Sequence, residues 1–306
     1  MNITIMPVTP GFVAEVGDVD LAGQVSVAER VAIMQAFTDY AVQIFPGQHL
    51  TSAQQVAFAQ WFGPIEDNVL AYDPKAVLRV TPKLVDISNL TPDNAIWAAD
   101  DRLRELSQAN QLWHTDSSFK RLPARMSMLY AHTVVPLGGH TEYADMRAAY
   151  DTLSPALKDR CAGLVAMHAL AYSRAKCGFA EFTAAERARL PPVPQMLIHT
   201  IAESGRTALY LASHIGEVLG LETTAAAALL DELLKHATQR QFVYLHRWRE
   251  HDLVMWDNRC TMHRGTRYDD LRYVRDMQRA TVSDVANTCQ QAGIEVPVPT
   301  ARAEMR

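Results

Sequence analysis

The sequence lacks any apolar run long enough to cross a bilayer, and its cysteines are few and far apart. The longest purely apolar stretches span only a few residues, such as the AAAALL segment that ends at Leu230, so no transmembrane helix is expected. The amino-terminal stretch MNITIMPVTP has no basic segment followed by a long apolar one, so no signal peptide is expected. The four cysteines show no CxxC spacing, which is typical of reduced thiols in a cytoplasmic protein.

The chain also lacks a strong charge of either sign and any flexible linker. Its 306 residues carry a net charge of −5, and 48% of them are hydrophobic. This is ordinary globular composition, and the mild acidity argues against a general nucleic-acid binder. No repeat, low-complexity tract or Gly/Ser-rich segment divides the chain. We therefore expect a single domain over residues 1–306.

Helices are expected near the amino terminus and in two later insertions. Ser26 and Glu29 form a capping-box pattern, which predicts a helix start. That helix would bury an apolar stripe made of Val27, Val31, Met34 and Phe37. A second helix is predicted over 52–62, where Gly63 and Pro64 stop it. The two insertions are predicted over 146–164 and 224–236.

Short strands dominate the remainder of the chain. Their apolar content and flanking turn residues predict strands over 41–45, 84–88, 127–135, 140–146, 195–201, 207–211, 241–248, 252–256 and 275–282. Strands at both ends of the chain with helices between them predict a mainly β domain with helical insertions, a β-sandwich or jelly roll.

The stretch NQLWHTDSSF, residues 110–119, carries the first candidate chemistry. In an extended segment, residues i and i+2 project from the same face, so His114 and Asp116 point together while Thr115 points away. One imidazole and one carboxylate supply two of the three ligands of a two-His-one-carboxylate iron site, which leaves three metal positions open. The pair alone is a weak signal, because a third ligand must come from elsewhere among eleven histidines.

The carboxy-terminal segment supplies a further histidine and paired arginines. His263 follows a predicted strand and a polar turn, and Arg275 and Arg279 share one face of the strand 275–282. Six arginines stand against three aspartates between residues 259 and 279, a local charge of +3. Two buried guanidiniums would be costly without anions, which favours carboxylate ligands. The alternative is a solvated basic face.

These spacings resemble those of the Fe(II)- and 2-oxoglutarate-dependent dioxygenases of the taurine dioxygenase group. That family's pattern is His-x-Asp, a Thr about 25 residues later, a distant His, and an Arg 11–14 residues after it. His114-Thr115-Asp116, Thr141, His263 and Arg275 fit these intervals. The likeness covers nearly the whole chain and is closest to the branch that cleaves 2,4-dichlorophenoxyacetate and related aryloxyalkanoates. The segments that carry this closer likeness are NQLWHTDSSF, DMRAAYDTL, ATQRQFVYLHRW and VMWDNRCTMHRG.

The resemblance implies a double-stranded β-helix, a cupin-like jelly roll, and a role for each matching residue. His114, Asp116 and His263 would bind Fe(II), with 2-oxoglutarate and O2 as cosubstrates. Thr141 and Arg275 would hold the distal carboxylate of 2-oxoglutarate. Arg279 matches a position that reaches a substrate anion or helps to order the cosubstrate. Asn110 matches a pocket-lining position, and the family likeness also suggests a homo-oligomer.

Two other histidines bear on the site. His214, in LYLASHIGEV, is a further candidate for the substrate pocket. The family usually carries a His shortly before a Gly-Arg turn, whereas this turn reads IAESGR with Ile201 in that place. The nearest histidine is His199, and the sequence leaves open whether it serves instead.

The activity implied is hydroxylation of the carbon beside the ether oxygen of a small anionic aromatic substrate, an aryloxyalkanoate. The product would break down to a phenol and an oxo acid, alongside succinate and CO2. The same chemistry on taurine, another alkylsulfonate or another small carboxylate is the alternative. A jelly-roll binding protein without catalysis is disfavoured by the intact triad and Arg275. A zinc hydrolase is disfavoured because no general base adjoins the ligands.

Overall fold

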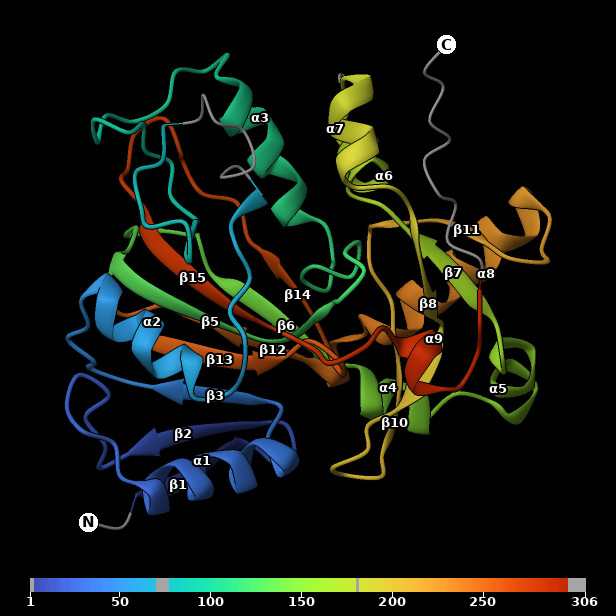
Figure 1. Ribbon diagram of the computed structural model, residues 1–306, viewed down its shortest axis with the longest axis horizontal. Coiled ribbons are helices and arrows are strands. Elements are labelled where there is room, and N and C mark those ends of the chain that lie inside the picture. Colours follow the sequence, from blue (N-terminus) through green and yellow to red (C-terminus); the bar gives the residue numbers. More distant parts are fainter. Residues whose placement is uncertain (1–2, 70–76, 180–181, 297–306) are drawn as a thin grey trace.

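A seven-stranded sheet forms the left side of the molecule in Figure 1. The computed structural model describes residues 3–69, 77–179 and 182–296. Only β2 and β3 pair in parallel within this sheet. In spatial order its strands are β1 (Thr4–Thr9), β2 (Val13–Gly17), β3 (Val42–Phe45), β13 (Leu253–Asp257), β5 (Ala124–Thr133), β15 (Asp276–Ser283) and β4 (Val85–Asp86).

A smaller sheet faces the large one and completes the jelly roll. It contains β12 (Val243–His246), β6 (Thr141–Asp145) and β14 (Thr261–Gly265), all antiparallel. Val254 and Trp256 of β13 pack into the same hydrophobic cluster as Tyr143 of β6, whereas Leu253 and Met255 point to the other face of the large sheet. This alternation is the period of a strand buried on both sides. The predicted mainly β, cupin-like jelly roll with helical insertions is confirmed.

Two helices, α1 (Val27–Asp39) and α2 (Ser52–Gln60), cover the outer face of the large sheet (Figure 1). The predicted capping box of Ser26 is present at the start of α1. The predicted apolar stripe is wrong at Val27 and Val31, which are 69% and 53% exposed, but Phe37 is buried and Met34 packs against the same cluster. The buried residues Ile33, Ala36 and Phe37 form their own helical stripe. At 3.6 residues per turn, that stripe lies roughly opposite the two valines.

The helical insertions lie on the side of the smaller sheet away from the amino terminus (Figure 1). The helix predicted over 146–164 is two helices, because Ser154 caps a new helix that has Pro155 in its first turn. The strand predicted over 195–201 is also two, since its halves pair with different partners. These elements are α4 (Met146–Asp151), α5 (Pro155–Cys161), β8 (Val193–Met196) and β9 (Ile198–Thr200).

The remaining elements frame these sheets. They are α3 (Arg102–Ser107), η2 (Gln108–Gln111), β7 (Val165–His168), α6 (Leu170–Ala175), α7 (Ala184–Arg189), β10 (Thr207–Leu209), β11 (Ile215–Val218), α8 (Thr223–Ala237), η3 (Arg240–Phe242) and α9 (Thr288–Gln291). Along the described ranges, no helix is both long and apolar enough to span a membrane. All four cysteines are free thiols.

Candidate iron and cosubstrate site

The three predicted metal ligands come together at the edge of the smaller sheet. His114, Asp116 and His263 are all buried, and their ligand atoms lie within 4.8 Å of one another. Asp116 Oδ1 is 3.9 Å from His114 Nε2, and Asp116 Oδ2 is 3.7 Å from His263 Nε2. Two imidazoles and one carboxylate at this spacing fit a facial iron triad.

Backbone pairing fixes the two histidines side by side. The His114 N–H donates to the His263 carbonyl at 3.0 Å, and the His263 N–H donates back to the His114 carbonyl at 2.8 Å. This isolated bridge extends the smaller sheet at β14. Thr115 turns away, and its hydroxyl donates to the Leu211 carbonyl at 3.0 Å. The chain then turns sharply at Ser117, which has a φ of 50°.

A network of hydrogen bonds orients the ligands. Ser127 Oγ donates to Asp116 Oδ2 at 2.7 Å, and Asn258 Nδ2 donates to Ser127 Oγ at 2.9 Å. Asn258 Oδ1 accepts from the Asp116 backbone N–H at 3.2 Å. His114 Nδ1 is 2.7 Å from the Leu112 carbonyl, so this nitrogen carries the proton and Nε2 is left for a metal. No pattern in the sequence pointed to Ser127. For Asn258 the available signal was an Asn shortly after a predicted strand.

Removal of the Ser127 hydroxyl is expected to weaken iron binding without abolishing the reaction. In Ser127→Ala, the Asp116 carboxylate loses a donor, so we expect roughly 10- to 100-fold weaker apparent affinity for Fe(II). Turnover should recover at high Fe(II), which a titration of succinate formation against Fe(II) measures. Ser118→Ala is a matched control, because Ser118 is equally buried but is bonded to His168 instead. Equal Fe(II) dependence in both variants would contradict the assignment.

The ionisation of the triad suits a divalent metal. Burial lowers the pKa of both His114 and His263, so both imidazoles are neutral at pH 7. Burial acts to raise the pKa of Asp116, but the adjacent guanidinium of Arg279 and the hydrogen bond from Ser127 oppose it, and the pKa is lowered. Arg279 Nη1 lies 2.5 Å from Asp116 Oδ1. Neutral imidazoles and an ionised carboxylate are the forms that bind a metal ion.

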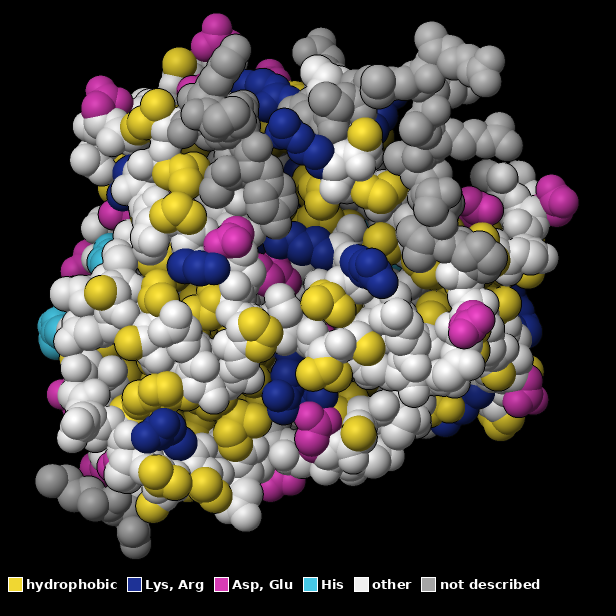
Figure 2. Space-filling model, in the orientation of Figure 1, with side chains coloured by type: hydrophobic (Ala, Val, Ile, Leu, Met, Phe, Trp, Pro, Cys, Tyr) yellow, Lys and Arg dark blue, Asp and Glu magenta, His cyan; other side chains and the backbone are white. Residues whose placement is uncertain are grey.

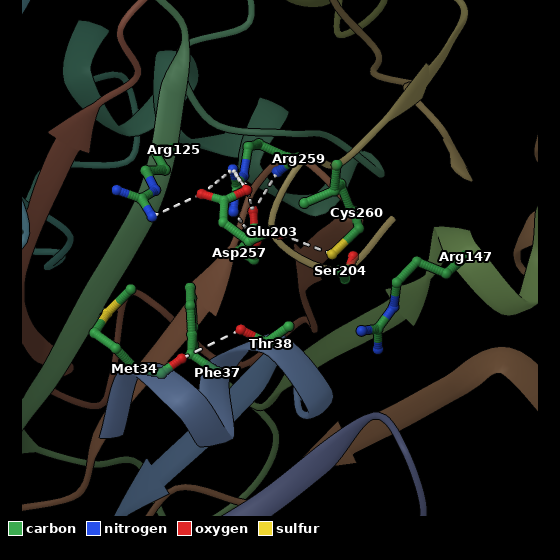
Figure 3. A pocket seen from close by; sticks show the side chains of 11 residues that line it. Met34, Phe37, Thr38, Arg125, Arg147, Glu203, Ser204, Asp257, Arg259 and Cys260 are labelled. Carbon is green, nitrogen blue, oxygen red and sulfur yellow. Dashed lines mark hydrogen bonds and ion pairs between the residues drawn. The ribbon is translucent and has the colours of Figure 1, made fainter. Parts of the chain in front are cut away.

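An ion-pair cluster behind the triad holds the turn between β13 and β14 (Figure 3). Arg259 pairs with Asp257 and with Glu203, both at 2.8 Å. These contacts border a cavity of about 20 Å³, which has room for about one water molecule. Every charge named here has a partner, so the cluster is structural: it fixes the turn that carries Asn258.

Arg275 is a buried cation without a carboxylate partner among the described residues. Its guanidinium donates to the carbonyls of Gly139 at 3.3 Å and Ile87 at 3.1 Å, and Asn89 accepts from its backbone N–H at 2.8 Å. Burial lowers the pKa of Arg275. A desolvated guanidinium of this kind needs an anion. The alternative of a solvated basic face therefore fails at this position.

Thr141 begins β6 two residues after Gly139, so it lies at the same end of the smaller sheet as Arg275. Its hydroxyl accepts a hydrogen bond from Trp248 Nε1 at 3.0 Å. Two residues further along, the Tyr143 ring stacks on His263 with centroids 6.1 Å apart. The Tyr143 hydroxyl is buried without a partner. No pattern in the sequence pointed to Tyr143, whose ring contacts one of the ligands.

The other predicted residues occupy different surroundings. Arg279 lies on the same face of β15 as Met277, as predicted, but its guanidinium contacts Asp116. His214 is buried with its ring edge-on to His114, centroids 6.0 Å apart. Asn110 is half-buried in η2. His199 Nε2 contacts the Arg259 carbonyl at 2.6 Å, within the ion-pair cluster rather than the triad.

A hollow of about 420 Å³ opens beside the triad. Leu112 and Gly265, which flank the ligands, lie in its wall. Figure 2 shows Lys and Arg side chains gathered on this side of the molecule, between α3 and α7 of Figure 1. A cavity of this volume is large enough for a small organic acid. The described residues that line it are Gln108, Gln111, Leu112, Cys177, Arg264, Gly265, Thr266 and Arg267.

The jelly roll, the two-His-one-carboxylate triad and the buried arginine together define a mononuclear non-haem iron oxygenase. Comparison with known proteins agrees with this class. A family model described as taurine catabolism dioxygenase TauD, TfdA family matches residues 4–281. The chain belongs to this family.

Individual relatives are similar over nearly the whole chain. An alpha-ketoglutarate-dependent 2,4-dichlorophenoxyacetate dioxygenase of Cupriavidus pinatubonensis is 43% identical over 94% of this chain and 99% of its own. An (S)-phenoxypropionate/alpha-ketoglutarate-dioxygenase of Sphingobium herbicidovorans is 35% identical over 87% and 90%. The crystal structure of AAD-2 in complex with Mn(II) and N-oxalylglycine has a TM-score of 0.87 and 43% identity, covering 94% and 99%.

Proposed function

We propose that this enzyme hydroxylates the carbon next to the ether oxygen of aryloxyalkanoates, with Fe(II), 2-oxoglutarate and O2. The observation that carries the proposal is the buried Arg275 without a carboxylate partner beside an intact triad, in a chain 43% identical to a 2,4-dichlorophenoxyacetate dioxygenase. The hydroxylated product is a hemiacetal. Its collapse releases a phenol and an oxo acid, which is glyoxylate when the substrate is a phenoxyacetate.

Each residue of the site has a proposed role in this reaction. His114, Asp116 and His263 would hold the iron, which supplies oxygen activation when it is bound. Arg275 and Thr141 would hold the distal carboxylate of 2-oxoglutarate, since a guanidinium offers parallel N–H donors and Thr141 adds a hydroxyl.

Three further residues would line the substrate side of the iron. They are Arg279, Asn110 and His214. Arg279 would keep Asp116 ionised and face the substrate beyond it. The protein's own contribution would be to position the two organic acids and to exclude water from between them.

We also propose three properties of the whole protein. The chain would act as one catalytic domain, because strands of the large sheet contribute to both hydrophobic clusters. It would work in the cytoplasm, a reducing compartment that suits four free thiols. It would assemble as a homo-oligomer, which light scattering of the purified protein measures.

The substrate class is tested by supplying purified iron-loaded enzyme with candidate acids. We expect phenol from 2,4-dichlorophenoxyacetate and phenoxypropionates, with one succinate formed for each phenol. Taurine tests the alternative through sulfite release. Sulfite without phenol would replace aryloxyalkanoates by alkylsulfonates within the same chemistry. Failure of every aryloxy acid to release phenol would refute the proposed substrate class.

A further inference from the structure

Arg174 is a second guanidinium without an anionic partner near the triad. It lies in α6, which is tied to the substrate side of the site by a hydrogen bond from the Ala169 N–H to the His214 carbonyl at 2.9 Å. Arg174 Nη1 donates to Ser173 Oγ at 3.2 Å, while Arg174 Nε is buried without a partner. Within the described ranges, no carboxylate lies at ion-pair distance from Arg174.

Arg174 and Arg275 differ from the other perturbed arginines of the described chain. Burial lowers the pKa of Arg275, and burial lowers that of Arg174 to about 10. Each arginine with a raised pKa is paired with at least one aspartate; these are Arg79, Arg147, Arg249 and Arg259. Two desolvated cations therefore lack an anion, and the proposed reaction brings two organic anions to the iron.

The two cations stand in different parts of the site. Lys176, two residues after Arg174, donates to the carbonyls of Ser213 and Ile215 at 2.8 and 3.1 Å, which places the end of α6 beside His214. Arg275 lies instead over the ring of Tyr268, with its guanidinium carbon 6.0 Å from the ring centroid. Arg174 thus lies on the His214 side of the triad, and Cys177, three residues later, lines the 420 Å³ hollow.

His214 offers a second unsatisfied group on this side. Its Nδ1 is buried without a partner, and its ring packs edge-on against Phe119 with centroids 4.8 Å apart. A neutral imidazole carries a proton on one ring nitrogen and can donate it to an anion. Arg279, the other candidate cation, already has Asp116 as its partner at 2.5 Å.

We infer that Arg174 and His214 together hold the carboxylate of the aryloxyalkanoate, while Arg275 holds 2-oxoglutarate. The inference rests on the proposed function and refines it. It assigns each organic acid its own arginine, the half-buried Arg174 and the buried Arg275, so the two acids do not compete for one cation. It also places the aryl end of the substrate toward the hollow, which admits a ring of ordinary size.

The test compares an acid with its uncharged amide, 2,4-dichlorophenoxyacetate with 2,4-dichlorophenoxyacetamide, by phenol release from iron-saturated enzyme. We expect Arg174→Gln to raise the KM for the acid roughly 10- to 100-fold, the range for a lost hydrogen-bonded charge. The preference for acid over amide should shrink by the same factor, with the KM for 2-oxoglutarate unchanged. Arg174→Lys, which keeps the charge, should restore part of the preference.

Arg121→Gln is the matched control, since Arg121 is an exposed arginine; its acid preference should equal that of the unaltered enzyme. His214→Gln should also reduce the preference, which keeps the inference testable if Arg174→Gln does not fold. An unchanged preference in both Arg174 variants, with phenol still released by the unaltered enzyme, overturns this inference alone. No phenol from the unaltered enzyme overturns the proposed function and this inference together.

Discussion

Asp116→Ala is expected to reduce turnover about a thousandfold or more. The substitution removes the only anionic ligand of the triad, and a loss of several kcal/mol in metal binding corresponds to at least this factor. It also leaves the half-buried Arg279 without its carboxylate partner. Two neutral imidazoles alone would hold Fe(II) weakly, and the nearby guanidinium of Arg279 would repel it. The bound iron and the succinate formed should therefore fall together.

Iron content after desalting and succinate formation with saturating 2-oxoglutarate measure this effect. Asp284→Ala is the matched control, because Asp284 is also a buried aspartate but lies at the far end of β15, bonded to Gln291. It should retain iron and activity. Circular dichroism of both variants separates loss of the site from loss of the fold. Normal iron content in Asp116→Ala would show that the carboxylate is not a ligand.

Arg275→Gln is expected to raise the KM for 2-oxoglutarate roughly 100-fold, with a smaller effect on the KM of the aryloxy substrate. Loss of one partner from a buried, hydrogen-bonded charge pair costs about 2–5 kcal/mol. Glutamine retains hydrogen bonding but cannot neutralise a carboxylate. Arg275→Lys keeps the charge and loses the forked geometry, so its KM should fall between those of the other two enzymes.

Steady-state assays that vary each acid separately distinguish the two effects. Arg272→Gln is the control. Arg272 lies three positions before Arg275 in the sequence, but it is exposed and stacks on the ring of Tyr273. Its KM for 2-oxoglutarate should match that of the unaltered enzyme. If Arg275→Gln raised the KM of the aryloxy substrate instead, Arg275 rather than Arg174 would hold the substrate carboxylate.

Local patterns in the sequence predicted many of the strands but not β1, β2, β7, β11 or β14. Alternation along an extended segment placed His114 and Asp116 together, because that period is a property of the backbone. Helix faces were harder to predict. Val27 and Val31 looked buried, yet α1 presents Ile33, Ala36 and Phe37 to the sheet. Which stripe packs inward depends on the partner surface, which the sequence of one helix does not contain.

Contacts between distant segments explain most of what the sequence could not predict. The basic cluster 259–279 looked uniform, but Arg259 pairs with Glu203 and Arg264 with Glu142. Only when those pairings are known is it clear that Arg275 has no carboxylate partner among the described residues. Ser127 and Arg174 were missed for the same reason, since neither lies near a ligand in the sequence.

The backbone bridge between His114 and His263 has a consequence for metal exchange. Because paired backbone segments hold the two histidines, their spacing is set by the fold of the chain. Iron could then leave and return without refolding of the chain. The same rigid spacing would accept other divalent ions, which nitrogen and oxygen ligands generally bind in a fixed order of strength. The supply of metal in the cell, rather than the protein, would decide which ion occupies the site and therefore whether the protein is active.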